Sequence, residues 1–178
     1  MLKSVDSTNS KPALAQSGLV WLWLAIVSLV VDQATKLYVL ANFKLHESVD
    51  VMPFFNFTYA QNRGAAFSFL SEAGGWQRWF FTIIAVSVSG LLIYWMRGLH
   101  KSTKGLNIAY ALVLSGAIGN LIDRLSYGFV VDFLHLYYEE HSWPVFNIAD
   151  VAICVGAFLI IIDAFINKDD NESEKGSK

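Results

Sequence analysis

Three short segments decide how this 178-residue chain is organised: GNLIDR at residues 119–124, GFVVDF at 128–133 and FNIAD at 146–150. Together they carry three carboxylates, an arginine and two asparagines, and the sequence around them is apolar. An ionisable group at membrane depth costs roughly 2.5–3.5 kcal/mol on insertion scales, so such groups are retained where they have a function. The three segments therefore predict a functional site inside or at the edge of a membrane.

The composition supports a membrane protein. Hydrophobic residues make up 54% of the chain and charged residues 16%, whereas a soluble domain has about 25% charged residues. The net charge of -2 gives no electrostatic footprint for nucleic acid. One cysteine cannot form an internal disulfide, and the four histidines show no metal-binding spacing, so a metalloenzyme is not expected.

Four long apolar runs are each close to the roughly 20 residues that span a bilayer. We expect an all-α membrane protein with one integral membrane domain over residues 1–178 and transmembrane helices over about 18–40, 75–96, 106–125 and 147–165. The polar tails, 1–17 and 167–178, fall outside these helices, and the second is expected to be disordered.

The first run has an alternative interpretation. A basic start followed by an apolar core also fits a cleaved signal peptide. Trp21 and Trp23 open the run, however, and no small-residue cleavage site follows it cleanly. We expect a retained first transmembrane helix.

The segment between the first two helices has a different pattern. Residues 55–59 (FNFTY) alternate apolar and polar side chains, which is the period of a half-buried strand. We expect a small extracytoplasmic β-sheet over about residues 44–70. Residues 126–146 form a second connection, strand-like or amphipathic, between the third and fourth helices.

Lysine and arginine positions predict the orientation. One side, made of both tails and the 97–104 loop, has eight of these residues, and the other has five. Cytoplasmic loops are enriched in lysine and arginine, so both termini are expected in the cytoplasm.

The ionisable groups converge on one level of the predicted bundle. At about 1.5 Å per residue, Asp32 lies roughly 21 Å along the first helix, near its outer end. Asp123 and Arg124 close the third helix, Asp150 lies about 5 Å into the fourth, and Asp132 is in the connection between them. Four separate pieces of chain thus bring charges to the same end.

Asp132 and Asp150 are the candidate catalytic pair. Two carboxylates in one pocket cannot both ionise easily, so one stays protonated as an acid while the other acts as a base on water. Asp150 lies in the first turn of its helix, where the helix dipole favours negative charge, and is expected to be the readier base.

The other polar residues have structural explanations. Asp32 and Lys36 are four apart and are expected to pair. Asp123 with Arg124 is expected to form an ion-pair element that locks the end of the third helix. Gly116 and Gly119 share a face with Asn120, and small residues there let the fourth helix approach closely.

Two further expectations concern the surroundings of the site. Cys154 is expected to be a small core residue. The aromatic side chains of the 128–143 connection are expected to lie over the site as a lid: Phe129, Phe133, Tyr137, Tyr138 and Trp143.

Five segments in order over residues 32–150 resemble the bacterial lipoprotein signal peptidases (signal peptidase II): DQxxK at 32–36, NRGAAFS at 62–68, GNLIDR at 119–124, VVDF at 130–133 and FNIAD at 146–150. The resemblance implies an aspartic endopeptidase of the bacterial inner membrane with its active site near the periplasmic face. Such an enzyme cleaves prolipoproteins on the N-terminal side of a lipobox cysteine that carries a diacylglyceryl group.

The resemblance also implies roles for individual residues. The catalytic aspartates fall on Asp132 and Asp150, and the supporting positions fall on Asn62, Gly64, Asn120, Asp123, Arg124 and Asn147. Expected partners are the prolipoprotein signal peptide, membrane lipids and globomycin-type inhibitors, and no metal or organic cofactor is expected.

Two other classes compete with this interpretation. A small proton-coupled membrane transporter also carries ionisable residues within its helices, but it requires them at several depths along a path. A structural protein, whose charges merely fix helix packing, leaves Asp132 without an explanation because that residue lies outside the predicted helices.

Overall fold

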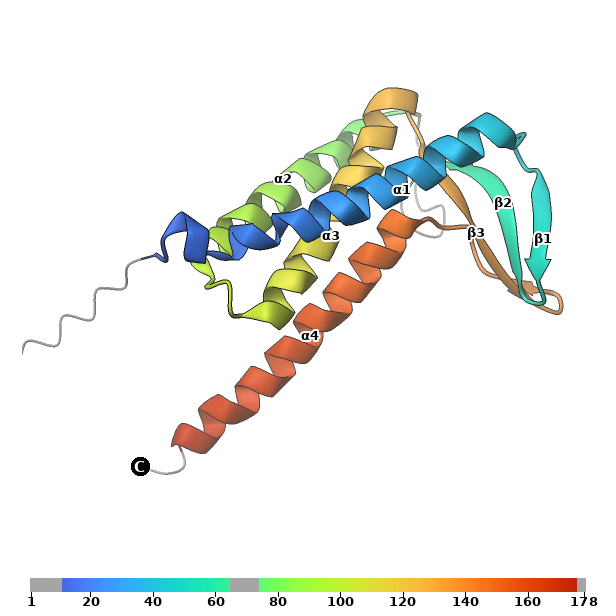
Figure 1. The fold of residues 1–178 in the computed structure, drawn as a ribbon. Coiled ribbons are helices and arrows are strands. Elements are labelled where there is room, and N and C mark those ends of the chain that lie inside the picture. The colour runs from blue at the N-terminus through green and yellow to red at the C-terminus, as the bar shows by residue number, and fades with distance from the viewer. Residues whose placement is uncertain (1–10, 65–73, 176–178) are drawn as a thin grey trace, which may run out of the picture.

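The computed structural model describes residues 11–64 and 74–175, the last nine by backbone alone. Its four long helices lie beside one another (Figure 1): α1 (Leu22–Asn42), α2 (Gln77–Gly98), α3 (Lys104–Tyr127) and α4 (Ile148–Lys175). Two short 3-10 helices, η1 (Leu14–Gln16) and η2 (Gly18–Trp21), precede α1.

All four helices are long and apolar enough to cross a membrane, over Gly18–Asn42, Gln77–Gly98, Lys104–Tyr127 and Ile148–Ile166. The ends of these helices lie within two residues of the ends of the four predicted spans. Beyond its apolar span the α4 backbone stays helical through Lys175. The segment from 167 to 175 has no Gly or Pro to end the helix, and the predicted disorder of residues 167–178 stays a prediction.

The third helix is the centre of the bundle. Half of its apolar span is buried, against 17% for each of the other three. Small residues make this possible because they let neighbouring backbones approach. A Cβ on Gly116 would collide with the backbone carbonyl of Ala149 in α4, and one on Gly156 would lie 2.7 Å from the carbonyl oxygen of Ala109. The predicted contact between the glycine face of α3 and α4 is confirmed.

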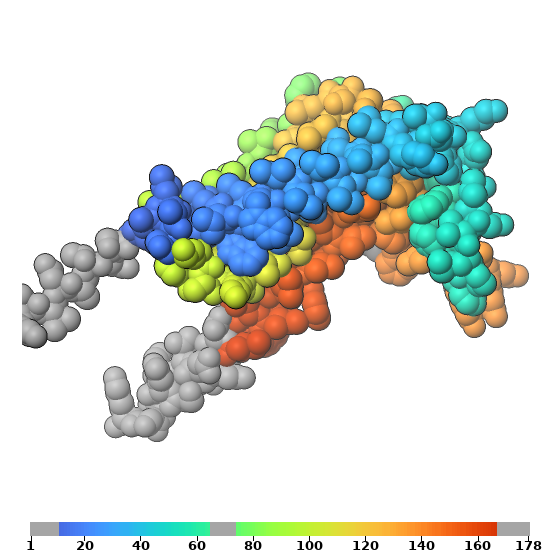
Figure 2. Space-filling model, viewed as in Figure 1, coloured from blue at the N-terminus to red at the C-terminus, as the bar shows by residue number. Residues whose placement is uncertain are grey.

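An antiparallel sheet projects from one end of the bundle (Figures 1 and 2), which we call the sheet end. Its strands, in spatial order, are β1 (Ser48–Met52), β2 (Phe55–Asn62), β3 (Val130–Tyr138) and β4 (His141–Ser142). The predicted small sheet is confirmed over β1 and β2, while residues 65–70 of that prediction lie outside the described part of the chain. The strand-like alternative for the 126–146 connection is correct, because β3 pairs with β2 and places Asp132 opposite Ala60.

A small apolar core joins the sheet to the first helix. It consists of Val39 from α1, Tyr59 from β2, and Val131 and Phe133 from β3. Phe133 is 4% exposed, so its predicted place in a lid is wrong. Successive side chains of a strand point to opposite faces; Val131 and Phe133 thus pack inward while Asp132, between them, faces the helix ends.

The close approach at Gly116 can be tested by replacing it with alanine. We expect Gly116→Ala to destabilise the protein by about 1–3 kcal/mol, because the added methyl meets a backbone carbonyl that cannot rotate away. Gly90→Ala is the matched control, since a Cβ at Gly90 of α2 has no neighbour within 4 Å. Thermal unfolding in one detergent compares them, and equal melting temperatures would contradict this packing.

Candidate active site

The start of α4 holds one of the two candidate aspartates. Asn147 precedes the first helical residue, and its Oδ1 accepts a hydrogen bond of 2.9 Å from the backbone N–H of Asp150. In return Oδ2 of Asp150 accepts from the backbone N–H of Asn147 at 3.3 Å. This reciprocal pair is a capping box, so the residues that begin the helix also fix the carboxylate of Asp150.

The same asparagine reaches the other aspartate. Asn147 Nδ2 donates to Oδ1 of Asp132 at 2.6 Å and to Oδ1 of Asn120 at 3.2 Å. Asn120 in turn donates through Nδ2 to Oδ1 of Asp150 at 2.8 Å. Asp132 on β3 and Asp150 on α4 are therefore connected through two hydrogen-bonded amides, and the predicted convergence of the two carboxylates is seen in the geometry.

A buried ammonium group orients this pair of amides. Lys36 of α1 is 1% exposed, and its Nζ lies 3.0 Å from each of three oxygens: Oδ2 of Asp32, Oδ2 of Asp123 and Oδ1 of Asn120. An ammonium has three protons to donate, so every donor is matched. Because the Asn120 oxygen faces Lys36, its NH2 group is left to face Asp150.

These contacts confirm one expected ion pair and correct another. Asp32 and Lys36 pair within α1 as predicted. Asp123 also forms an ion pair, but its partner is Lys36 of another helix and not its neighbour Arg124. Helical spacing shows which residues share a face, whereas the partner of Asp123 depends on how α1 packs against α3.

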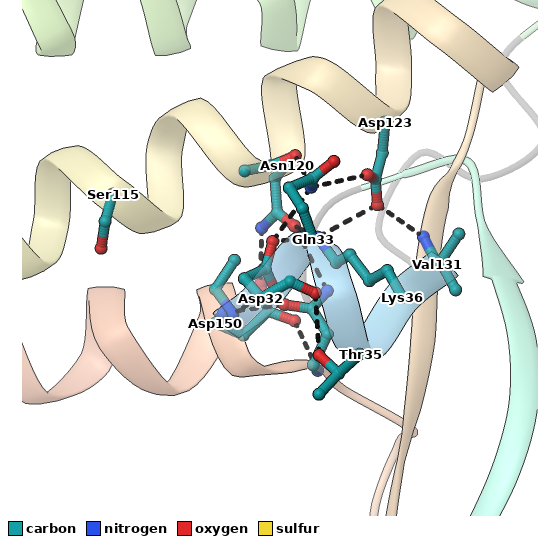
Figure 3. Close-up of polar contacts among 12 residues, drawn as sticks. Asp32, Gln33, Thr35, Lys36, Ser115, Asn120, Asp123, Val131 and Asp150 are labelled. Carbon is teal, nitrogen blue, oxygen red and sulfur yellow. Dashed lines mark hydrogen bonds and ion pairs between the residues drawn. The ribbon is translucent and has the colours of Figure 1, made fainter. Parts of the chain in front are cut away.

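The two carboxylates that pair with Lys36, Asp32 and Asp123, extend the network to α4 and β3 (Figure 3). Asp32 accepts from the backbone N–H of Ala149 in the first turn of α4 at 2.9 Å. Asp123 accepts from the backbone N–H of Val131 in β3 at 3.0 Å. One polar cluster thus joins α1, α3, α4 and β3.

Gln33 is a member of this cluster that was not assigned a role from the sequence. Its Nε2 lies 3.1 Å from Oδ2 of Asp32, 3.1 Å from Oδ1 of Asp123 and 3.2 Å from the backbone oxygen of Gly119. The sequence did contain a signal for this role, because Gln33 is an uncharged amide next to Asp32 in a largely apolar helix. Gln33 holds α1 against α3 beside Gly119. The two helices are close there, because a Cβ on Gly119 would lie 2.5 Å from Oδ2 of Asp32.

Arg124, Gly64 and Asn62 connect the end of α3 to the end of β2. Arg124 Nη2 donates to the backbone oxygen of Gly64 at 3.0 Å, and the N–H of Gly64 donates to Oδ1 of Asn62 at 2.9 Å. The Asn62 side chain also hydrogen-bonds to the carboxyl of Asp132. All of the predicted site residues therefore belong to one continuous region at the sheet end.

An apolar cavity of about 620 Å³ opens beside these polar groups. Asn62, Asn120, Arg124 and Asp150 contribute its polar edge, and most of the remaining wall is aliphatic or aromatic. Trp143, one of the expected lid residues, lines it and is 57% exposed. Its shape and chemistry suit a long apolar ligand with one polar group placed against Asp150.

Cys154 lines this cavity as well. Its side chain is exposed, so the prediction of a core residue is wrong. Cys154 lies four residues after Asp150, which is about one helical turn, and it therefore faces the same side of α4.

The carboxyl of Asp132 is strongly perturbed. Burial and, to a lesser extent, the nearby Asp150 raise its pKa to about 7, even though hydrogen bonds from Asn147 and Asn62 and the Lys36 charge act to lower it. A carboxyl with a pKa near 7 holds a proton over much of the neutral range, as a general acid must.

A buried acidic site between four membrane-length helices, open to an apolar cavity, defines an integral membrane enzyme. Known proteins agree. A family model described as signal peptidase II matches residues 24–166. Lipoprotein signal peptidases of Shewanella baltica (strain OS155) and Pseudoalteromonas translucida (strain TAC 125) are 57% and 54% identical, over 91% and 89% of this chain and 95% and 96% of their own.

Two solved structures, each described as a bacterial membrane enzyme, share this fold. Their TM-scores are 0.77 and 0.71 at 32% and 31% identity, and the matches cover 85% and 88% of this chain and 90% and 97% of theirs. The chain belongs to the signal peptidase II family, and it is a protease.

The balance of charge around Lys36 can be tested directly. Lys36→Met leaves two buried carboxylates, Asp32 and Asp123, without their cation, and removing one partner of a buried ion pair costs about 3–5 kcal/mol. Lys44→Met, at an exposed cation of the same end, is the control. Unfolding in detergent measures both variants.

A second substitution separates charge balance from simple loss of packing. Asp123→Asn added to Lys36→Met removes one of the two unpaired charges and should recover part of the lost stability. A double variant no more stable than Lys36→Met alone would contradict the electrostatic explanation.

Proposed function

We propose that this protein is an aspartic endopeptidase that removes the signal peptide from diacylglyceryl-modified prolipoproteins, cutting on the N-terminal side of the lipobox cysteine. Asp132 and Asp150 are the proposed catalytic pair. The observation that carries the proposal is their connection through Asn120 and Asn147 at the edge of an apolar cavity. The relatives, named lipoprotein signal peptidases, support the substrate class.

The proposed chemistry divides the work between the two carboxyls. Both oxygens of Asp150 accept hydrogen bonds from nitrogen, which suits the ionised form that acts as base. Asp132, with its pKa near 7, carries the proton. Asp150 removes a proton from water, the resulting hydroxide attacks the peptide carbonyl, and Asp132 protonates the carbonyl oxygen.

Collapse of the tetrahedral intermediate completes the cycle. The hydroxyl proton returns to Asp132, the C–N bond breaks, and the proton held by Asp150 goes to the leaving amine of the cysteine. The pair ends in its starting state. Asn120 and Asn147 keep both carboxyls in place throughout, and each remains hydrogen-bonded to its own aspartate.

The supporting residues have distinct proposed roles. Asn62, Gly64 and Arg124 lie where β2 meets the site and are proposed to bind the substrate backbone. Asp123 acts through Lys36 and the Val131 amide and so holds β3 in place. The apolar cavity accepts the hydrophobic part of the signal peptide, and globomycin-type peptides are expected to occupy the same space.

The proposed location is the bacterial inner membrane, with the sheet end on the periplasmic side. Lysine and arginine counts favour cytoplasmic termini, and Trp76, Trp79 and Trp143 belong to the proposed periplasmic end. The acyl chains of the substrate then remain in the outer leaflet while its scissile bond reaches the aspartates.

Replacing either aspartate tests the mechanism. We expect Asp132→Asn and Asp150→Asn each to reduce cleavage of a diacylated prolipoprotein peptide by at least a thousandfold, because neither variant retains both acid and base. Asp163→Asn, thirteen residues further along α4, is the control and should cleave at the parent rate. Turnover is measured by product mass, with thermal unfolding to show that the variants fold. Full activity in either dyad variant would refute the pair.

The raised pKa of Asp132 predicts a pH dependence. Activity, measured as kcat/KM, should fall as pH rises through about 7, because the acid loses its proton. The apparent pKa of this limb belongs to the coupled pair. A flat profile from pH 6 to 9 would contradict an acidic role for Asp132.

Stability supplies the control for that measurement. A carboxyl whose pKa is higher in the folded state binds more protons there, so its contribution to stability decreases from about pH 4 to about pH 7 and is constant above. A loss of activity above pH 7 with an unchanged melting temperature therefore reports titration of the site.

A further inference from the structure

A second cavity lies at the sheet end, where the start of α2 meets the end of α3. Its volume is about 720 Å³, and none of its lining residues belongs to the apolar cavity beside Asp150. Two arginines, Arg63 and Arg78, line it together with Trp79 and Gly128. We infer that this cavity binds the phosphate headgroup of an anionic phospholipid.

The first support is unmatched positive charge. Arg78 is half-buried, and its Nη2 donates to the backbone oxygen of Leu125 at 2.9 Å, but its Nε is buried without a hydrogen-bond partner. Among residues 11–64 and 74–166, both ion pairs belong to Lys36, and no carboxylate lines this cavity. Guanidinium groups bind phosphate oxygens through paired N–H donors, so an anionic phosphate matches the chemistry of the two arginines.

The start of α2 adds to this potential. Gly128 has a φ of 81° at the end of α3, and a Cβ there would lie 3.7 Å from Nη1 of Arg78. The first turn of α2 has neither an acidic residue nor a side-chain cap. The positive end of the α2 dipole is therefore uncompensated by its own residues. The start of α2 therefore increases the attraction for an anion at the arginines, while Gly128 leaves open space beside Arg78.

The second support, for a lipid rather than a free phosphate, is the surface next to the cavity. Trp79 lines the cavity, and its ring centroid lies 5.3 Å from the Arg78 guanidinium carbon. From Trp79 an exposed apolar stripe continues along α2 through Ile83 and Val86, which are 65% and 56% exposed. Positions four and seven residues apart share one helix face. A headgroup at the arginines thus places its acyl chains along this stripe.

Charge also distinguishes this lipid from other membrane components. Two arginines repel the cationic group of a choline headgroup, so a net anionic headgroup such as phosphatidylglycerol should bind more tightly. The diacylglyceryl group of the proposed substrate contains no phosphate. The inference therefore concerns a lipid other than the substrate, and it does not rest on the proposed reaction.

Lipid titration by native mass spectrometry, on the full chain in a neutral detergent, tests the inference. We expect phosphatidylglycerol to bind at least tenfold more tightly than phosphatidylcholine of the same acyl chains. Arg63→Gln should reduce this preference at least fivefold, and Arg63→Gln with Arg78→Gln should abolish it. Lys44→Gln, which removes an exposed cation of the same end outside the cavity, should leave it unchanged.

Three controls make the outcome decisive. Arg63 is exposed, so Arg63→Gln should keep the parent melting temperature. Arg78 also contacts the end of α3, so the single variant is the one that separates lipid binding from stability. Glycerol 1-phosphate, added as a competitor, should displace the lipid only at far higher concentration, because it lacks acyl chains. Asp132→Asn should bind phosphatidylglycerol like the parent, which separates this site from the reaction.

Equal affinity for the two lipids would overturn the inference, as would a preference that survives the double substitution. Displacement by glycerol 1-phosphate at the concentration of the lipid itself would overturn the lipid assignment and identify a free-phosphate site.

Discussion

The structure depends on one buried cation. Lys36 is 1% exposed and has an oxygen 3.0 Å away for each of its three protons. A buried charge is tolerated only when it is paired and fully hydrogen-bonded. This requirement brings two carboxylates and an amide from two helices to one point. The carboxylates then bind the first turn of α4 and the start of β3, so α1, α3, α4 and β3 all meet around Lys36.

The two asparagines convert this structural cluster into a candidate site for chemistry. Asn120 faces Lys36 with its oxygen and Asp150 with its nitrogen, while Asn147 caps α4 and also reaches Asp132. Neither aspartate contacts Lys36 in an ion pair within the described residues. The pair is therefore held by neutral amides, and one of its carboxyls can keep a proton that a direct cation contact would remove.

Much of this arrangement was predictable from the sequence. Apolar length alone defined the spans to within two residues, and rise per residue placed the aspartates of α1 and α4 at the same level as Asp123, at the end of α3, and Asp132, in the connection. The partner of Asp123 and the contacts of Gln33 were not predictable, because spacing within a helix does not determine which faces of different helices meet. The burial of Phe133, by contrast, had a signal: the alternation in VVDF puts it on the face opposite Asp132.

The hairpin between Asp132 and Asp150 determines where the length of this chain can change without moving the two aspartates. Leu134 and Phe146 form an isolated antiparallel bridge, with Leu134 N–H donating to the Phe146 oxygen at 2.8 Å and Phe146 N–H to the Leu134 oxygen at 3.0 Å. This bridge closes the base of the hairpin that β3 and β4 form over residues 135–145. Insertions or deletions between Tyr138 and His141, at the tip of this β3–β4 hairpin, leave the separation of Asp132 and Asp150 untouched, so the tip can differ in length while the spacing on either side of it stays constant.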